Sequence, residues 1–208
     1  MSVKPKNSGS IEIGQSKHPK YQSKNIISRT LVKNFYANLH ETIRNVEFNS
    51  VLDVGCGEGL VMKSMEKELR GKQCFAIDFD MNEVVDAKKN LDFCTVNQGS
   101  VYELDFADHS LDMVICTEVF EHLENPEAAL KEIERVAANY VVISVPREPI
   151  WRMLNMARGS YWKDLGNTPG HLNHWSGSSF PKFISTKFDV IKVVKPLPWT
   201  IVLAKKRK

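Results

Sequence analysis

Short apolar runs alternate with amphipathic stretches along most of this chain. Residues 51–54 form a β-branched, apolar run, which suits a strand buried on both faces of a sheet. Similar strand-like runs cover residues 73–77, 92–97, 111–116 and 140–145. Helix signals lie between most of these runs, as in the helix start at Asn125-Pro126-Glu127. Five strands that alternate with helices predict a parallel sheet with right-handed crossovers.

The two ends of the chain complete the predicted fold. The apolar positions that predict a leading helix over residues 25–45 recur every four residues: Ile27, Leu31, Phe35, Leu39 and Ile43. Near the C-terminus, residues 188–194 and 199–204 are strand-like, and the connection between them is short enough to allow only an antiparallel pair. We therefore expect an α/β fold with a doubly wound, mostly parallel, seven-stranded sheet and a C-terminal antiparallel hairpin.

Length and composition favour one globular domain. The chain has 208 residues, of which 42% are hydrophobic and 25% charged, and this length is too short for two ordinary domains. We expect residues 1–24, which are polar and basic, to be flexible and residues 25–208 to form a single domain. The sequence shows no apolar run near the ~20 residues of a membrane span, no signal-peptide core and no metal-binding cysteine spacing, so we expect a cytoplasmic protein with reduced cysteines.

A glycine-rich turn follows the first predicted strand. Gly55, Gly57 and Gly59 allow a ligand to approach the backbone N–H groups of this turn closely. A dinucleotide fingerprint would require another glycine at Leu60. The pattern Asp53-x-Gly-x-Gly-x-Gly instead resembles motif I of class I S-adenosylmethionine-dependent methyltransferases, and the chain is most similar to the small-molecule enzymes of the quinone-biosynthesis group. In that family the acidic residue orders the turn and the amino end of the cofactor.

The resemblance implies where the cofactor, S-adenosylmethionine, binds. Asp78 ends the second strand about twenty residues beyond the turn, where a carboxylate commonly binds ribose hydroxyls. In this family the turn after the third strand contacts the adenine, although many members have aspartate where this chain has Ser100. The stretch 104–114 is similar to the family pattern L-P-F-x-D-x-S-F-D-x-V, and residues 117–123 resemble the segment that follows it. The expected cofactor-binding residues are Asp53, Gly55, Cys56, Gly57, Gly59, Asp78, Phe79, Ser100, Val101, Thr117, Glu118 and His122.

Two of these residues have simpler interpretations. Asp78 is a candidate N-cap for the helix at residues 81–90, although Asp80 serves that purpose equally well. His122 is a candidate for local packing and hydrogen bonding, which we favour over a role in the site.

Residues 146–180 form an insertion that is expected to select the methyl acceptor. It begins with an apolar, methionine-rich helix and continues as a long loop rich in glycine and aromatic residues. The expected acceptor contacts are Tyr21, Arg29, Trp151, Tyr161, Trp162 and Trp175, of which the first two require the leading helix to act as a lid. His171 and His174 are the expected proton acceptors, because histidine titrates near neutral pH. Alternatively, Trp162 and Trp175 cover the core and the histidines bind loop backbone. Zinc is disfavoured, because no further ligand has fitting spacing.

The sequence thus favours an enzyme that transfers a methyl group from S-adenosylmethionine to an unidentified acceptor, which is expected to be small and apolar. A net charge of +3 does not indicate a nucleic-acid partner, whereas peripheral membrane contact and the oligomeric state are left open. A methyltransferase acting on nucleic acid or protein is the nearest alternative. A nicotinamide-dependent oxidoreductase is disfavoured by Leu60, and a non-catalytic binding subunit of the same fold is a further alternative.

Overall fold

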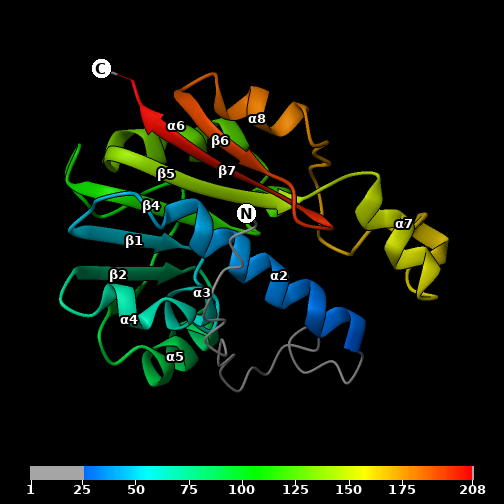
Figure 1. Cartoon of the computed structure of the whole chain (residues 1–208), viewed down its shortest axis with the longest axis horizontal. Helices are drawn as coiled ribbons and strands as arrows, with labels where there is room; N and C mark the ends of the chain where they lie inside the picture. The colour runs from blue at the N-terminus through cyan, green and yellow to red at the C-terminus, as the bar shows by residue number, and fades with distance from the viewer. Residues whose placement is uncertain (1–25, 208) are drawn as a thin grey trace, which may run out of the picture.

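The computed structural model describes residues 26–207, which contain a seven-stranded sheet in the order β3-β2-β1-β4-β5-β7-β6 (Figure 1). The predicted flexible segment at residues 1–24, with Tyr21, lies outside the described residues. The strands are β1 (Ser50–Val54), β2 (Gln73–Asp78), β3 (Thr95–Gln98), β4 (Leu111–Thr117), β5 (Ala137–Pro146), β6 (Phe188–Val194) and β7 (Trp199–Lys206).

The sheet combines parallel and antiparallel pairing as predicted. β1 pairs in parallel with β2 on one side and with β4 on the other, so the strand order reverses at the end of β1. β5 continues the parallel part beside β4 and then pairs antiparallel with β7, which pairs antiparallel with β6. In such open sheets, ligands bind beyond the carboxyl ends of the strands at the point of reversal.

Helices cover both faces of the sheet. They are α2 (Ile26–Ile43), α3 (Leu60–Ser64), α4 (Glu66–Leu69), α5 (Met81–Asn90), α6 (Pro126–Val136), α7 (Ile150–Ala157) and α8 (Ser179–Ile184), with 3₁₀ turns η1 (Phe120–His122) and η2 (Trp162–Asp164). Figure 1 shows α2 lying across the front of the sheet and α7 projecting beyond one end of it. The leading helix, predicted over residues 25–45, is therefore present.

The core is split into two clusters by the sheet. One contains Leu39 of α2 and Val51 of β1, together with buried residues of α3, α4 and α5. The other contains Leu52 of β1, Leu130 of α6 and Phe180 of α8. Adjacent residues of β1 thus enter opposite clusters, as the alternation of side chains along a buried strand requires.

Three local predictions differ from the structure. The apolar positions Leu60, Met62, Met65 and Leu69 predict one helix after the glycine turn, but that helix is broken at Met65. The Met65 backbone leaves the helical region while its side chain stays buried. β3 begins at Thr95 rather than at Asp92, because a turn closed by the bond from the Cys94 N–H to the Leu91 carbonyl precedes it. The sequence predicts that His122 lies on a helix after the fourth strand, but in the structure His122 lies in the 3₁₀ turn η1.

The stretch 104–109, which resembles a family pattern, is anchored to α6 by Arg135. The guanidinium donates to the carbonyl oxygens of Leu104 and Phe106, both at 2.8 Å, and to the carboxylates of Glu132 and Asp108. These contacts hold a segment without regular structure in place before it enters β4.

Within residues 26–207, no helix combines the length and apolar character needed to cross a membrane. All four cysteines are free thiols, and burial raises the pKa of Cys94 to about 12. The thiol of Cys94 is therefore protonated near neutral pH.

Candidate cofactor and acceptor site

The glycine turn after β1 adopts a backbone conformation that side chains with a Cβ rarely reach. Gly55, Gly57 and Gly59 have φ values of +72°, +52° and +79°. A Cβ on Gly55 would lie 2.4 Å from Cγ2 of Val119, and one on Gly59 would lie 2.6 Å from Cδ1 of Leu91. Gly55 and Gly59 are therefore required both by conformation and by space.

Asp78, at the end of β2, is joined to the glycine turn. One carboxylate oxygen accepts a hydrogen bond from the Gly57 N–H at 2.8 Å, and the other accepts from the Asp80 N–H at 2.9 Å. The cap of α5 is Asp80, whose side chain accepts from the Asn82 N–H at 2.8 Å. A carboxylate has about four acceptor sites, so Asp78 keeps the capacity to bind hydroxyl groups of a ligand.

These elements surround a pocket of about 550 Å³, which we call the glycine-turn pocket. It lies where the strand order reverses, and it receives residues from the carboxyl ends of β1, β2 and β4 and from the turn after β3. Ten of the expected cofactor-binding residues line it: Gly55, Cys56, Gly57, Asp78, Phe79, Ser100, Val101, Thr117, Glu118 and His122. Gly59, at the end of the glycine turn, and Asp53, which is buried in β1, do not line the pocket.

Several lining residues were not predicted. Phe35 of α2 contributes to the wall, which places the leading helix against the pocket. Tyr102, which follows the turn after β3, also lines the pocket, and its hydroxyl oxygen accepts a hydrogen bond from the Asn125 N–H at 3.2 Å. The four-residue period of apolar positions predicted that Phe35 lies on the apolar face of α2. This period does not indicate which part of the protein the apolar face contacts.

Asp53 is the most perturbed carboxyl group near the pocket. Its side chain is 1% exposed, and within the described residues neither of its oxygens has a hydrogen-bond partner. Burial, and secondarily the negative charge of Asp78, raises the pKa of Asp53 to about 7. A buried carboxyl group without a donor is costly when charged, so this site favours a bound cation or a proton.

Glu118 links the end of β4 to the antiparallel part of the sheet. Its carboxylate accepts the Trp199 indole N–H at 2.7 Å and the Ser144 hydroxyl at 3.2 Å. Its φ of +61° is unusual for a residue other than glycine, and such strained residues cluster at functional sites. These bonds fix the carboxylate at the edge of the pocket.

The insertion folds back toward the pocket through α7. Trp151 donates its indole N–H to the Thr168 hydroxyl at 2.9 Å and stacks on His171, with ring centroids 5.9 Å apart. His171 is 8% exposed, and its ring lies edge-on to His122 with centroids 4.9 Å apart. The loop thus places His171 beside a residue that lines the pocket.

The other predicted acceptor-side residues lie elsewhere. Trp175 is partly buried and packs on Phe180 and Phe183 of α8 against the core cluster, as the alternative interpretation of this residue described. Tyr161 and Trp162 are exposed at η2, Arg29 is exposed on α2, and His174 is exposed in the loop. None of Arg29, Trp151, Tyr161, Trp162, Trp175, His171 and His174 lines the glycine-turn pocket.

A mostly parallel sheet that ends in an antiparallel pair, with a glycine turn and an acidic residue on the next strand at its ligand end, is the architecture of Rossmann-like, S-adenosylmethionine-dependent methyltransferases. Comparison with known proteins agrees with this class. Residues 52–142 match the methyltransferase domain family. The fold also matches the structure of magnesium protoporphyrin IX methyltransferase from Synechocystis with bound SAH, with a TM-score of 0.67 and 16% identity, over 93% of this chain and 90% of that one.

Proteins that are similar to this chain in sequence are also named as methyltransferases. The chain is 31% identical over 98 residues to a methyltransferase of Schizosaccharomyces pombe, which covers 41% of this chain and 35% of that protein. It is 24% identical over 154 residues to a ubiquinone biosynthesis O-methyltransferase of Pasteurella multocida, over 60% of this chain and 62% of that protein. The chain thus spans less than two thirds of the length of these relatives. The matches confirm the resemblance to methyltransferases and support S-adenosylmethionine as the cofactor of the domain.

Proposed function

We propose that the protein transfers the methyl group of S-adenosylmethionine to a small acceptor, which binds between the glycine-turn pocket and the loop that carries His171. The observation that carries this proposal is the pocket itself. It lies at the reversal of strand order and combines a glycine turn, the carboxylate of Asp78 and an exposed aromatic face at Phe79.

The chain's own residues fit the cofactor. Asp78 offers acceptor sites for the ribose hydroxyls, and the ring of Phe79, whose side chain is 79% exposed, offers a face to the adenine. The buried carboxyl group of Asp53 is suited to the charged amino group of the cofactor, because it has no other donor among the described residues. Ser100 and Val101 line the adenine side of the pocket.

The bound cofactor supplies an electrophilic methyl group, and the protein has to position an acceptor in line with it. The stacked pair of Trp151 and His171 limits the acceptor to the space beside His122. Of the two histidines proposed as proton acceptors, His171 lies next to this space, whereas His174 is exposed to solvent. An apolar acceptor, closure of α2 as a lid and a cytoplasmic location stay predictions from the sequence.

Calorimetry tests the proposal directly. S-Adenosylmethionine and its demethylated product should bind the purified chain, and NAD should not. Asp78→Ala should weaken cofactor binding by at least ~1.5 kcal/mol, about tenfold, since a hydrogen bond to a charged group is worth this much. Asp80→Ala is the matched control, because Asp80 caps α5 without lining the pocket. Tight NAD binding, or equal cofactor affinity in the Asp78 and Asp80 variants, would contradict the proposal.

A further inference from the structure

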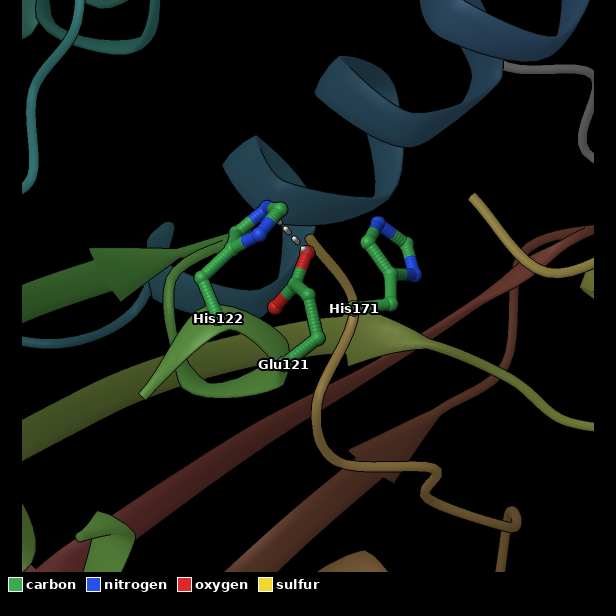
Figure 2. Close-up of side chains that lie close together, drawn as sticks. All are labelled: Glu121, His122 and His171. Atoms are coloured by element: carbon green, nitrogen blue, oxygen red, sulfur yellow. Dashed lines mark ion pairs between the residues drawn. The ribbon is translucent and has the colours of Figure 1, made fainter. Parts of the chain in front are cut away.

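Glu121, His122 and His171 bring three potential metal ligands together beside the glycine-turn pocket. One ligand atom from each residue lies within 4.8 Å of the other two (Figure 2). Glu121 and His122 are adjacent in η1, while His171 comes from the insertion loop. We propose that these three side chains bind a divalent transition-metal ion at the acceptor side of the pocket.

The spacing of the ligand atoms suits one ion after a small adjustment. Nε2 of His122 lies 3.9 Å from Oε1 of Glu121, the pair joined by a dashed line in Figure 2. In a tetrahedral site, two atoms bound to one zinc ion at about 2.1 Å lie about 3.4 Å apart. The ligand atoms of the cluster, which lie within 4.8 Å of one another, therefore have to approach by at most about 1.4 Å, to which rotation of exposed His122 can contribute.

The orientation of His122 turns its Nε2 toward Glu121. Its Nδ1 lies 2.9 Å from the Gly170 carbonyl oxygen, which can only accept, so Nδ1 carries the proton in this contact. Nε2 of the neutral ring then presents a lone pair toward Glu121. A ligating histidine that donates its second N–H to a backbone carbonyl is the usual arrangement at protein metal sites.

The two segments that supply the ligands are bound tightly to each other. The Glu121 carbonyl accepts the N–H groups of Leu172 and Asn173 at 2.7 and 3.0 Å. The Asn173 side-chain amide donates to the carbonyls of Phe120 and Leu123 at 3.1 and 2.6 Å. The two backbone segments that carry the ligands are thus held together by bonds that do not depend on a metal, which favours a preorganised site.

The ligand types define the kind of metal. Two imidazoles and one carboxylate suit zinc, iron, cobalt, nickel and manganese, whereas magnesium and calcium prefer oxygen ligands. Three protein ligands leave coordination positions open. Because His122 lines the pocket, an oxygen of the acceptor can take one of these positions. This role for the metal rests on the proposed methyl transfer, whereas the binding of the metal is independent of it.

Zinc titration of the untagged chain, followed by calorimetry, tests the site. One zinc ion should bind per chain, and magnesium should bind at least about 100-fold more weakly. Glu121→Gln, His122→Ala and His171→Ala should each weaken zinc binding at least about tenfold. Matched controls are Glu127→Gln, an exposed acid at the start of α6, and His109→Ala, an imidazole in the turn before β4, which should bind zinc as the unaltered chain does.

A second readout covers variants that lose their fold. Cobalt should produce visible absorption bands in the unaltered chain that zinc abolishes, and Glu121→Gln, which keeps the size of the side chain, should lack them. Binding of the demethylated cofactor, measured in the same samples, reports on the glycine-turn pocket independently. Zinc binding without cofactor binding would refute methyl transfer alone. Zinc affinity that is unchanged in the three ligand variants, or absent from a chain that binds cofactor, would overturn the metal site.

Discussion

Replacement of Asp53 by asparagine should make the cofactor-free protein more stable at neutral pH. The carboxyl group is fully buried without a hydrogen-bond partner among residues 26–207, and its pKa is about 7 against 3.8 for an exposed aspartate. Between these pH values the folded protein holds a proton that the unfolded chain has released. Stability therefore falls as pH rises from about 4 to about 7 and becomes level above that range.

The size of the effect follows from the same two values. The interval from 3.8 to about 7 corresponds to roughly 4 kcal/mol of destabilisation above pH 7, at ~1.4 kcal/mol for each tenfold change in proton affinity. Most of this loss, about 3 kcal/mol, develops between pH 5 and pH 8. Asparagine has the same shape and no charge, so Asp53→Asn should remove this loss.

Urea denaturation at intervals between pH 5 and pH 8 measures the difference in free energy of unfolding between the variant and the unaltered chain. Asp112→Asn is the control, because backbone N–H groups of Asn49 and Ser50 hold the pKa of Asp112 below its usual value, and its charge is constant over this range. Saturating S-adenosylmethionine should reduce the pH dependence of the free energy of unfolding of the unaltered chain, because the proposed contact with the amino group of the cofactor stabilises the Asp53 carboxylate. Parallel stability curves for Asp53→Asn and the unaltered chain would refute the reasoning.

Three further substitutions test how the site is supported. Gly55→Ala should cost at least about 2 kcal/mol of stability, while Gly71→Ala, which has a similarly positive φ but open space around it, should cost less; equal losses would show that the contact with Val119 is unimportant. Trp151→Ala should cost about 3 kcal/mol in urea denaturation, because the indole packs on core and loop, and near-normal melting with weakened acceptor binding would favour a recognition role instead. Arg135→Ala should cost about 2 kcal/mol of stability through the loss of its bonds to two carbonyls, whereas Asp108→Ala, which removes an exposed ion pair, should cost less than about 1 kcal/mol. A lower melting temperature for Asp108→Ala than for Arg135→Ala would contradict this.

Much of the fold could be predicted from the sequence, because each strand and most helices carry their own periodic signal. The run at residues 51–54 and the four-residue period of α2 are local patterns, and both elements appear where expected. The antiparallel end of the sheet followed from a connection too short for any other pairing. The break at Met65 was not predictable in this way, because the apolar pattern continues across it and the buried residues of both short helices enter the same core cluster.

The residues of the glycine-turn pocket could be brought together by sequence reasoning for a related reason. Gly55, Gly57 and Asp78 lie at the ends of adjacent parallel strands, and the topology of the sheet brings such ends together. A glycine turn after one strand and a residue at the end of the next strand are therefore expected to lie close together in space. No comparable rule places a residue of a long insertion, and the sequence therefore did not show that Trp175, expected beside the acceptor, packs partly buried on Phe180 and Phe183 of α8.

The same limit explains why the cluster around His171 was missed. Ligand spacing in a sequence relates residues that are close along the chain, such as His171 and His174. In the structure His174 is exposed, and the neighbours of His171 are Glu121 and His122, which are far away along the chain. Between His122 and His171 the chain passes through α6, β5 and α7 and then returns to η1. There the Leu172 N–H donates a backbone hydrogen bond to the Glu121 carbonyl. Because β5 lies beside β4 in parallel, its carboxyl end has to deliver the insertion to the same end of the sheet as η1, so the topology supplies the proximity that spacing alone does not show.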